Sequence, residues 1–315
     1  MSIKSLMNYS FVSKYARWIP EKKRRETWRE SVDRVMHMMY EQYPDVNGDI
    51  VWAYDMMHKK RVLGSQRALQ FGGKPIFKHH ARMYNCIASY IDRLRFFQEC
   101  MYLLLCGCGT GFSVQKHHVA KLPTLVKAKK GTKKFVIPDT IEGWSDALGV
   151  LVSSFFEQDE LFPEYVGKTV VFDYSGIRAA GAYLSSSGGK APGPEPLKKA
   201  LSNIKKVLDK AIKNAEFASG DVRKITPIEA YDIVMHAADA VISGGVRRSA
   251  TICLFSPDDE KMVQAKTGNW FHDNPQRGRS NNSALLLRDS TTKEEFATLM
   301  ESVREFGEPG FVWSD

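Results

Sequence analysis

The sequence lacks any run of about 18 uncharged apolar residues, so no membrane-spanning helix is predicted. Its first residues contain no continuous apolar segment followed by a cleavage site, so no secretion signal is expected. Cysteine is scarce in this chain of 315 residues, with five: Cys86, Cys100, Cys106, Cys108 and Cys253. An odd number at irregular spacing argues against a disulfide framework and favours a reducing compartment, so we expect a cytoplasmic protein.

Cys106 and Cys108, separated by one residue, are the feature that suggests a zinc site. Structural zinc needs a full tetrahedral set of ligands. Although His117 and His118 follow, their spacing matches no standard zinc pattern. We therefore predict no bound metal.

The composition is otherwise ordinary, with 43% hydrophobic and 26% charged residues, which is enough apolar material for a folded core. A length of 315 residues allows one large domain or two of average size. The net charge of +9 would suit nucleic acid, but the basic residues are spread over separate segments. Phosphorylated small ligands account for the positive balance equally well.

Residues 1–62 are expected to form a helical region that serves packing rather than chemistry. Apolar residues recur there with the helical period of about 3.6 between positions 26 and 43. Pro44, Asn47 and Gly48 interrupt this pattern, and a second helix is predicted over 50–62.

Predicted strands and helices alternate in the remainder of the chain. The clearest strand is 168–174, which is apolar on both faces, as expected of a buried parallel strand. Thr226, Pro227 and Glu229 together form a strong helix start. Further strands are predicted at 251–255, 284–287 and from 310, further helices at 144–156, 197–218 and 293–306, and an exposed loop at 127–134. This alternation predicts an α/β architecture with a parallel sheet.

The chain is organised around residues 63–114. We expect a turn at 63–73, then Tyr84-Asn-Cys86, an apolar helix and a glycine-rich loop at 106–112. Small residues on both sides of a thiol would let a ligand's phosphates and sugar approach the backbone closely. Such a thiol is accessible, although a single cysteine is more often a small buried hydrophobe. The glycines are not a dinucleotide-binding fingerprint, because a helix and not a strand precedes them.

The order of these pieces resembles the ribonucleotide reductases, and most closely the monomeric adenosylcobalamin-dependent (class II) ribonucleoside-triphosphate reductases. Segments elsewhere that are similar to the family's motifs are 15–22 (YARWIPEK), 138–144 (PDTIEGW), 243–250 (SGGVRRSA), 279–283 (RSNNS) and 307–310 (GEPG). The resemblance implies the first half of a ten-stranded α/β reductase barrel at 63–315, preceded by the N-terminal helical region at 1–62. An effector-site insertion typical of the monomeric form would occupy about 126–220.

The resemblance also implies a chemistry. In this family a transient thiyl radical, generated with adenosylcobalamin, takes the 3′-hydrogen of the ribose. A pair of cysteines then supplies two electrons for removal of the 2′-hydroxyl and closes to a disulfide, which a thioredoxin-like carrier reopens. Cys86 takes the place of the first cysteine of that pair.

The matching positions imply a site for the ribonucleotide substrate. Asn85 and Ser65 fall where the family contacts the sugar and the phosphate, and Gly109 falls where a side chain would obstruct the substrate. Arg247 lies on the loop that couples effector to substrate, between glycines that let the loop change shape. The alternative for Arg247 is a surface pair with Arg248 beside a turn.

An effector site for a deoxynucleotide is implied as well. Asp92 is similar to the acidic residue that holds the ribose of the effector, although its spacing from Cys86 differs from the family's. Arg178, near a second glycine-containing loop, is a candidate contact for the effector phosphates.

The sequence departs from the family at its end. The radical-bearing cysteine is expected shortly after 307–310, but no cysteine follows Cys253, which we interpret as a buried strand residue. The resemblance therefore implies a complementary C-terminal reductase chain. That chain would supply the radical cysteine, the second reducing cysteine and most of the cobalamin-binding surface, and this chain alone should not turn over.

Two other functions stay open. The chain could be a catalytically inactive nucleotide-binding module that keeps the effector site. A basic nucleic-acid-binding protein is the less favoured alternative, and its binding would weaken steeply with added salt. The preference for triphosphate over diphosphate substrates rests on the resemblance to the monomeric form.

Overall fold

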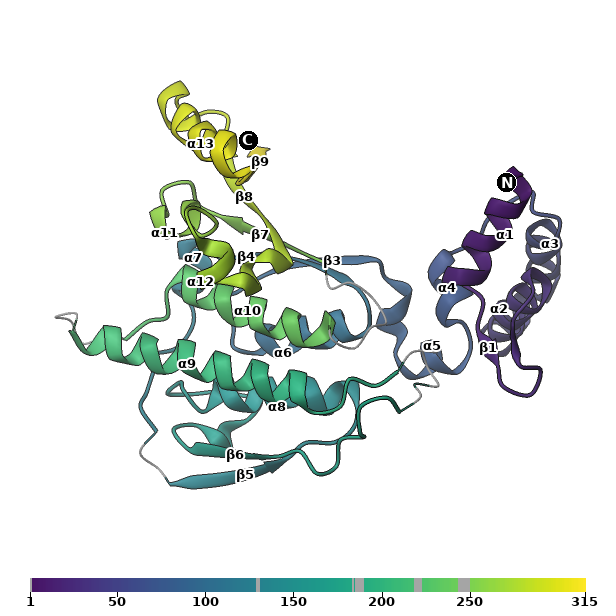
Figure 1. Ribbon diagram of the computed structural model, residues 1–315, viewed down its shortest axis with the longest axis horizontal. Helices are drawn as coiled ribbons and strands as arrows, with labels where there is room; N and C mark the ends of the chain where they lie inside the picture. The colour runs from purple at the N-terminus through teal and green to yellow at the C-terminus, as the bar shows by residue number, and fades with distance from the viewer. Residues whose placement is uncertain (1, 129–130, 183, 185–189, 218–222, 243–249) are drawn as a thin grey trace. The chain divides into compact units, whose positions relative to one another are not determined.

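The computed structural model describes residues 2–315 except 129–130, 183, 185–189, 218–222 and 243–249 (Figure 1). The chain divides into two units, which are Met1–Asn85 with Tyr183–Lys190, and Cys86–Ala182 with Ala191–Asp315. No helix in the described part of the chain is long and apolar enough to cross a membrane.

The first unit is built from short helices around a small apolar core. Its elements are α1 (Ile3–Lys14), the antiparallel pair β1 (Trp18–Ile19) and β2 (Arg24–Arg25), α2 (Trp28–Gln42), α3 (Asn47–His58), α4 (Gln66–Phe71) and α5 (Lys74–Lys78). Val35, Met57, Leu69 and Phe71 are among its buried residues. The helices predicted over 26–43 and 50–62 are confirmed as α2 and α3.

The turn predicted at 63–73 is wrong in its middle part, where the chain forms α4. Ser65 caps this helix, because its hydroxyl accepts a hydrogen bond from the amide of Ala68 at 3.2 Å. Leu69 and Phe71 are buried in the core that α4 shares with α2. The polar residues and glycines at both ends suggested a turn, but these two apolar side chains favour a packed helix.

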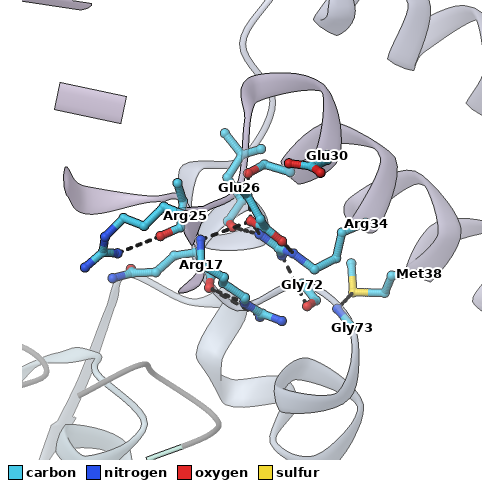
Figure 2. A network of polar contacts seen from close by, with 12 residues as sticks. Arg17, Arg25, Glu26, Glu30, Arg34, Met38, Gly72 and Gly73 are labelled. Carbon is cyan, nitrogen blue, oxygen red and sulfur yellow. Dashed lines mark hydrogen bonds and ion pairs between the residues drawn. The ribbon is translucent and has the colours of Figure 1, made fainter. Parts of the chain in front are cut away.

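A buried ion pair connects the segment before α2 to α4 (Figure 2). The carboxylate of Glu26, 7% exposed, accepts hydrogen bonds from Nε and Nη2 of Arg34 at 2.7 and 2.8 Å. It also accepts from the hydroxyl of Ser31 at 2.8 Å and from the amide of Arg17 at 3.1 Å. Arg34 donates in turn to the carbonyl of Leu69 at 2.7 Å. Burial alone would raise the pKa of Glu26, but these donors outweigh burial and lower it.

A five-stranded sheet, parallel throughout, forms the frame of the second unit (Figure 1). In both sequence and spatial order its strands are β3 (Cys86–Tyr90), β4 (Gly109–Ser113), β7 (Thr251–Phe255), β8 (Ser280–Leu287) and β9 (Gly310–Ser314). The helices between these strands include α6 (Arg95–Leu105), α10 (Pro227–Ile242), α11 (Glu260–Val263), α12 (Trp270–Asp273) and α13 (Lys293–Phe306). The predicted α/β architecture with a parallel sheet is confirmed.

Two of these helices, α6 and α10, cover one face of the sheet. Phe112 of β4 lies near Phe96 of α6 and Tyr231 of α10, with ring centroids 6.0 and 6.4 Å away. Cys253 on β7 is fully buried in the same core, as predicted. The covered face of the sheet is therefore the main hydrophobic core of the unit.

The chain between β4 and α10 forms an additional layer on these helices (Figure 1). Its elements are α7 (Lys116–Val119), β5 (Thr132–Val136), α8 (Ile141–Ser153), β6 (Thr169–Asp173) and α9 (Glu195–Phe217). α8 packs against α6, α9 packs against α10, and β5 pairs with β6 in a parallel ribbon beyond α8 and α9. Short 3-10 helices are described at Pro44–Val46, His80–Met83, Pro163–Tyr165 and Pro275–Arg279.

Two predictions for this layer are wrong in part. The strand predicted at 168–174 is present as β6, but it pairs only with β5 and is not enclosed in a larger sheet. One face of the ribbon is consequently open, and Val171 is 50% exposed. The predicted loop at 127–134 runs into β5, which starts at Thr132.

We predict that Glu26→Gln lowers the free energy of unfolding of the first unit by about 3 kcal/mol, because Arg34 loses its counter-charge. Hydrogen exchange of the amides in α2 and α4 measures this loss locally. Folding lowers the pKa of Glu26, so its carboxylate stabilises the folded unit at pH values above the ordinary glutamate pKa. This stabilisation is lost as the pH falls through the pKa that Glu26 has in the folded state. Glu41→Gln, at an exposed position of α2, is the matched control, and equal effects of both variants at neutral pH would contradict this interpretation.

Candidate active site

Three strand starts meet at one edge of the parallel sheet. Cys86, the first residue of β3, lies opposite Gly109, the first residue of β4. Thr110 lies opposite Thr251 at the start of β7, and the amide of Thr110 donates to the carbonyl of Ala250 at 2.9 Å. Backbone pairing therefore holds three segments that are distant in sequence side by side.

Side chains alternate between the two faces of the sheet, and Cys86 belongs to the open face. In the middle of this face, Ala88 and Ile252 flank Gly111. A Cβ atom added to Gly111 would lie 3.6 Å from Cβ of Ala88 and 3.3 Å from Cγ2 of Ile252. Ile252 is 40% exposed. Because Gly109 carries no side chain, β4 places no side chain directly opposite the thiol.

Cys86 is the cysteine that solvent reaches. It is exposed, whereas Cys100, Cys106, Cys108 and Cys253 are buried. Burial raises the pKa of Cys100 to about 12 and raises that of Cys253 well above its ordinary value, so neither forms a thiolate readily. The prediction that the thiol at position 86 is accessible is confirmed, and the alternative of a buried hydrophobe is wrong for this residue.

The glycine-rich loop predicted at 106–112 is wrong for its second half, which is strand β4 from Gly109 onward. A strand was also missed between Cys86 and the apolar helix, where β3 occupies five residues. Glycine is depleted in strands because it has no side chain to pack, so Gly109 and Gly111 suggested a turn. Here the neighbouring strands and the helices beneath supply the packing.

Ser65 and Asn85, the predicted substrate contacts, belong to the first unit. Both side chains are exposed, and the hydroxyl of Ser65 is engaged as the cap of α4. The carbonyl of Tyr84, just before Asn85, accepts a hydrogen bond from Nη2 of the buried Arg67 at 2.7 Å. The backbone that leads to Cys86 is therefore anchored within its own unit.

The structure does not bring the two predicted effector contacts together. Asp92 accepts a hydrogen bond from Nη1 of Arg93 at 2.9 Å, just before α6. Arg178 pairs instead with Asp139 before α8, with Nε and Oδ2 2.6 Å apart. Arg247 lies outside the described residues, and the chain resumes at Ala250 beside β4.

A match to a known family covers the layer between the sheet strands. Residues 113–208 match the family described as B12-dependent ribonucleotide reductase, insertion domain. The match begins at the end of β4 and includes α8, β6 and the first half of α9.

Longer similarities cover nearly the whole chain. The adenosylcobalamin-dependent ribonucleoside-triphosphate reductases of Lactobacillus helveticus and Lactobacillus leichmannii are each 26% identical to it over 95% of its residues. The chain spans 47% of the length of each of these relatives. A crystal structure of a B12-dependent (class II) ribonucleotide reductase has a similar fold, with a TM-score of 0.77 and 23% identity over 96% of this chain and 48% of that chain. The resemblance to the class II reductases is confirmed.

Sequence reasoning missed residues at both ends of the reductase-like sheet. At the ends of β3 and β4, the ring of His118 stacks on Tyr90 at 4.6 Å, and its Nδ1 lies 3.0 Å from the hydroxyl of Ser113. Beside the last strand, Glu308 accepts from Lys266 at 2.8 Å and from the amide of Asn282 at 3.0 Å. The sequence offered no signal for these contacts, because β3 was not predicted and the burial of Lys266 depends on the fold.

We predict that N-ethylmaleimide modifies one cysteine of the folded chain, and that this cysteine is Cys86, because alkylation needs a thiolate that the reagent can reach. Mass spectrometry of the digested product identifies the site. Cys86→Ser should abolish the fast modification, whereas Cys100→Ser should retain it. Fast labelling of Cys106 or Cys108 in the native chain would contradict the burial described above, and urea should expose all five thiols.

Proposed function

We propose that this chain is the N-terminal part of a class II ribonucleotide reductase that reduces ribonucleoside triphosphates. The observation that carries the proposal is the exposed thiol of Cys86 beside Gly109, on the open face of a parallel sheet with the fold of these reductases. In this proposal the five strands are the first half of a ten-stranded barrel. The open face then becomes the inside of the barrel.

The ribose of a substrate would lie beside the thiol, against β4. Gly109, opposite Cys86, carries no side chain, so the sugar would approach the backbone there. Asn85, next to Cys86 in the chain, and Ser65 would contact the sugar and the phosphates. Arg247 would reach the base or a phosphate from the segment that ends beside β4.

Cys86 would act as one member of the reducing pair. As the 2′-hydroxyl leaves as water, Cys86 and a second cysteine each give up one proton and one electron and join in a disulfide. A thioredoxin-like protein would then reopen the disulfide by thiol exchange. An exposed position suits both steps, because the thiol must reach first the substrate and then its partner cysteine.

Adenosylcobalamin, named for the relatives, would supply the radical when bound. Among the described residues, no group of three or more His, Cys, Asp or Glu side chains could hold a metal ion. The open face near Cys86 includes Ala88, Gly111 and Ile252. None of these three residues has a side chain that could hydrogen-bond to a large cofactor. We therefore place the cofactor mainly on the complementary part of the reductase.

The complementary part would dock along the open face and the free edge of the sheet. Tyr90 is 48% exposed and Ile252 is 40% exposed on that face. In the described structure β9 pairs with β8 alone, so its other edge offers unpaired backbone groups. An open apolar face beside an unpaired edge is what a second half-barrel would cover.

A nucleotide-binding module without catalysis is the second candidate. The family match at 113–208 favours it, because this match covers the insertion and not the strand that carries Cys86. Nucleotide binding that never leads to product in the presence of a complementary chain would support this alternative.

We predict that this chain, mixed with the C-terminal half of a class II reductase, adenosylcobalamin and a dithiol, forms deoxynucleotides from ribonucleoside triphosphates. Cys86→Ser should lower the rate by at least about a hundredfold, because the reducing pair loses one thiol. Cys253→Ala, at a buried position of β7, is the matched control and should keep most of the activity. Product formation that is unchanged by Cys86→Ser would exclude the proposed role.

A further inference from the structure

A buried ion pair lies where the last strand of the sheet begins. Nζ of Lys266 is 2.8 Å from Oε1 of Glu308, and the side chain of Lys266 is 6% exposed. The same ammonium group donates to the carbonyl of Ser280 and lies 5.7 Å from the ring centroid of Trp270. A lysine buried to this degree needs a counter-charge, because an unpaired ammonium group out of water is costly. Neither residue belongs to β3 or β4, so the candidate active site does not account for the pair.

The second carboxylate oxygen of Glu308 takes the place of a strand carbonyl. Oε2 accepts a hydrogen bond from the amide of Asn282 at 3.0 Å. The pairing of β8 with β9 begins one residue later, at Ser283 and Gly310, so the side chain extends the hydrogen-bond ladder by one position. The hydroxyl of Ser302 in α13 donates to the backbone carbonyl of Glu308 at 2.9 Å and holds it there.

The start of β8 is itself held from the side of α10. Oγ of Ser280 donates to Oδ1 of Asn282 at 2.7 Å and lies 2.9 Å from the phenol oxygen of Tyr231. Tyr231, in α10, is fully buried. The ion pair therefore attaches β9 to a part of β8 whose position does not depend on β9.

Aromatic packing decides which face of β9 is covered but leaves its position along β8 open. Phe311 and Trp313 both lie near Phe296 of α13, with ring centroids 5.0 and 5.6 Å away. A slip of β9 by one residue would turn both rings to the open face. A slip by two residues would keep an aromatic ring beside Phe296, because the two rings occupy alternate positions on the same face.

The ion pair excludes this two-residue slip. The slip would move the backbone of Glu308 by about 7 Å, out of reach of Lys266 and of the Asn282 amide. A buried ammonium group and a strand amide would then both lose their partner, which is costly. A Cβ atom added to Gly310 would lie 2.9 Å from Oγ of Ser283, so a residue with a side chain would be crowded at this position.

We propose that Lys266 and Glu308 are positioning residues that set the register of β9, and with it the edge on which the complementary part of the reductase docks. The docking partner comes from the proposed function, on which this inference rests. β3 and β9 are the outer strands of the described sheet (Figure 1). A second half-barrel has to meet both edges at once, and barrel closure requires a fixed stagger between strands. A displacement of β9 by about 7 Å would therefore prevent closure at the two edges together.

Two double variants separate the charge of the pair from its hydrogen bond. Lys266→Met with Glu308→Gln removes both charges, so no unpaired charge stays buried, and the side-chain amide oxygen can still accept from Asn282. Lys266→Met with Glu308→Leu removes both charges and the acceptor as well. Lys116→Met with Asp258→Asn neutralises an exposed ion pair of the same unit and is the matched control.

Hydrogen exchange of the chain alone tests the role of the carboxylate. The amide of Asn282, observed by NMR after isotope labelling of asparagine, should be protected in the wild-type chain and in the Glu308→Gln double variant. In the Glu308→Leu double variant it should exchange at least about a hundredfold faster, because the amide has lost its acceptor. Equal protection in the two double variants would overturn the role assigned to Glu308.

Docking tests the consequence for the partner. The complementary half of a class II reductase is titrated with each chain, and calorimetry gives the dissociation constant. The wild-type chain, the control and the Glu308→Gln double variant should bind within about threefold of one another, and the Glu308→Leu double variant at least about tenfold more weakly. At saturating complementary half, product formation by the Glu308→Leu double variant should return to within about twofold of wild type, because the change affects docking and not chemistry.

The outcomes distinguish this inference from the proposed function. If the Glu308→Leu double variant docks as tightly as wild type although Asn282 exchanges faster, the pair does not prepare the edge, and the reductase proposal survives. If the wild-type chain does not dock at all, the proposed function fails together with the inference. Equal rates of N-ethylmaleimide labelling at Cys86 in all variants check that the rest of the sheet is intact.

Discussion

The parallel register between β3 and β4 is the constraint on which the candidate site depends. It sets Cys86 opposite Gly109, and therefore places a thiol beside a position without a side chain. Because side chains alternate along a strand, a slip of one residue would turn Cys86 toward the helices and bury it. The packing of Phe112 against Phe96 and Tyr231 on the covered face opposes such a slip. The hydrophobic core thus fixes which residues stay accessible on the other face.

The helices α6 and α10 lie between the sheet and the insertion. On one side they cover the sheet, and on the other they support α8 and α9 of the insertion. The sheet that carries Cys86 and the insertion are therefore parts of one continuous packed unit. A change in the packing of α9 on α10 would be transmitted through these helices to the strands, which is a physical route for coupling.

The sequence predicted the long periodic elements well and the short glycine-containing ones poorly. The helix predicted at 293–306 coincides with α13, and Thr226 with Glu229 forms the predicted start of α10. β3 and β4 were missed, because their stability comes from pairing with each other and from the core beneath them. The motif around Cys86 predicted an accessible thiol. The pairing of Cys86 with Gly109 could not be predicted, because it depends on the topology of the sheet.

The contacts of Glu308 determine where the last strand begins. Through Lys266 and the amide of Asn282, this carboxylate fixes the entry to β9, where Gly310 pairs with Ser283. Ser283 is level with Leu254, Ser113 and Tyr90, so β9 begins at the level where β3 ends. Five residues of strand then carry the backbone about 15 Å farther from Cys86. A segment that continued from β9 to the Cys86 thiol would therefore have to reverse its direction and return along the open face.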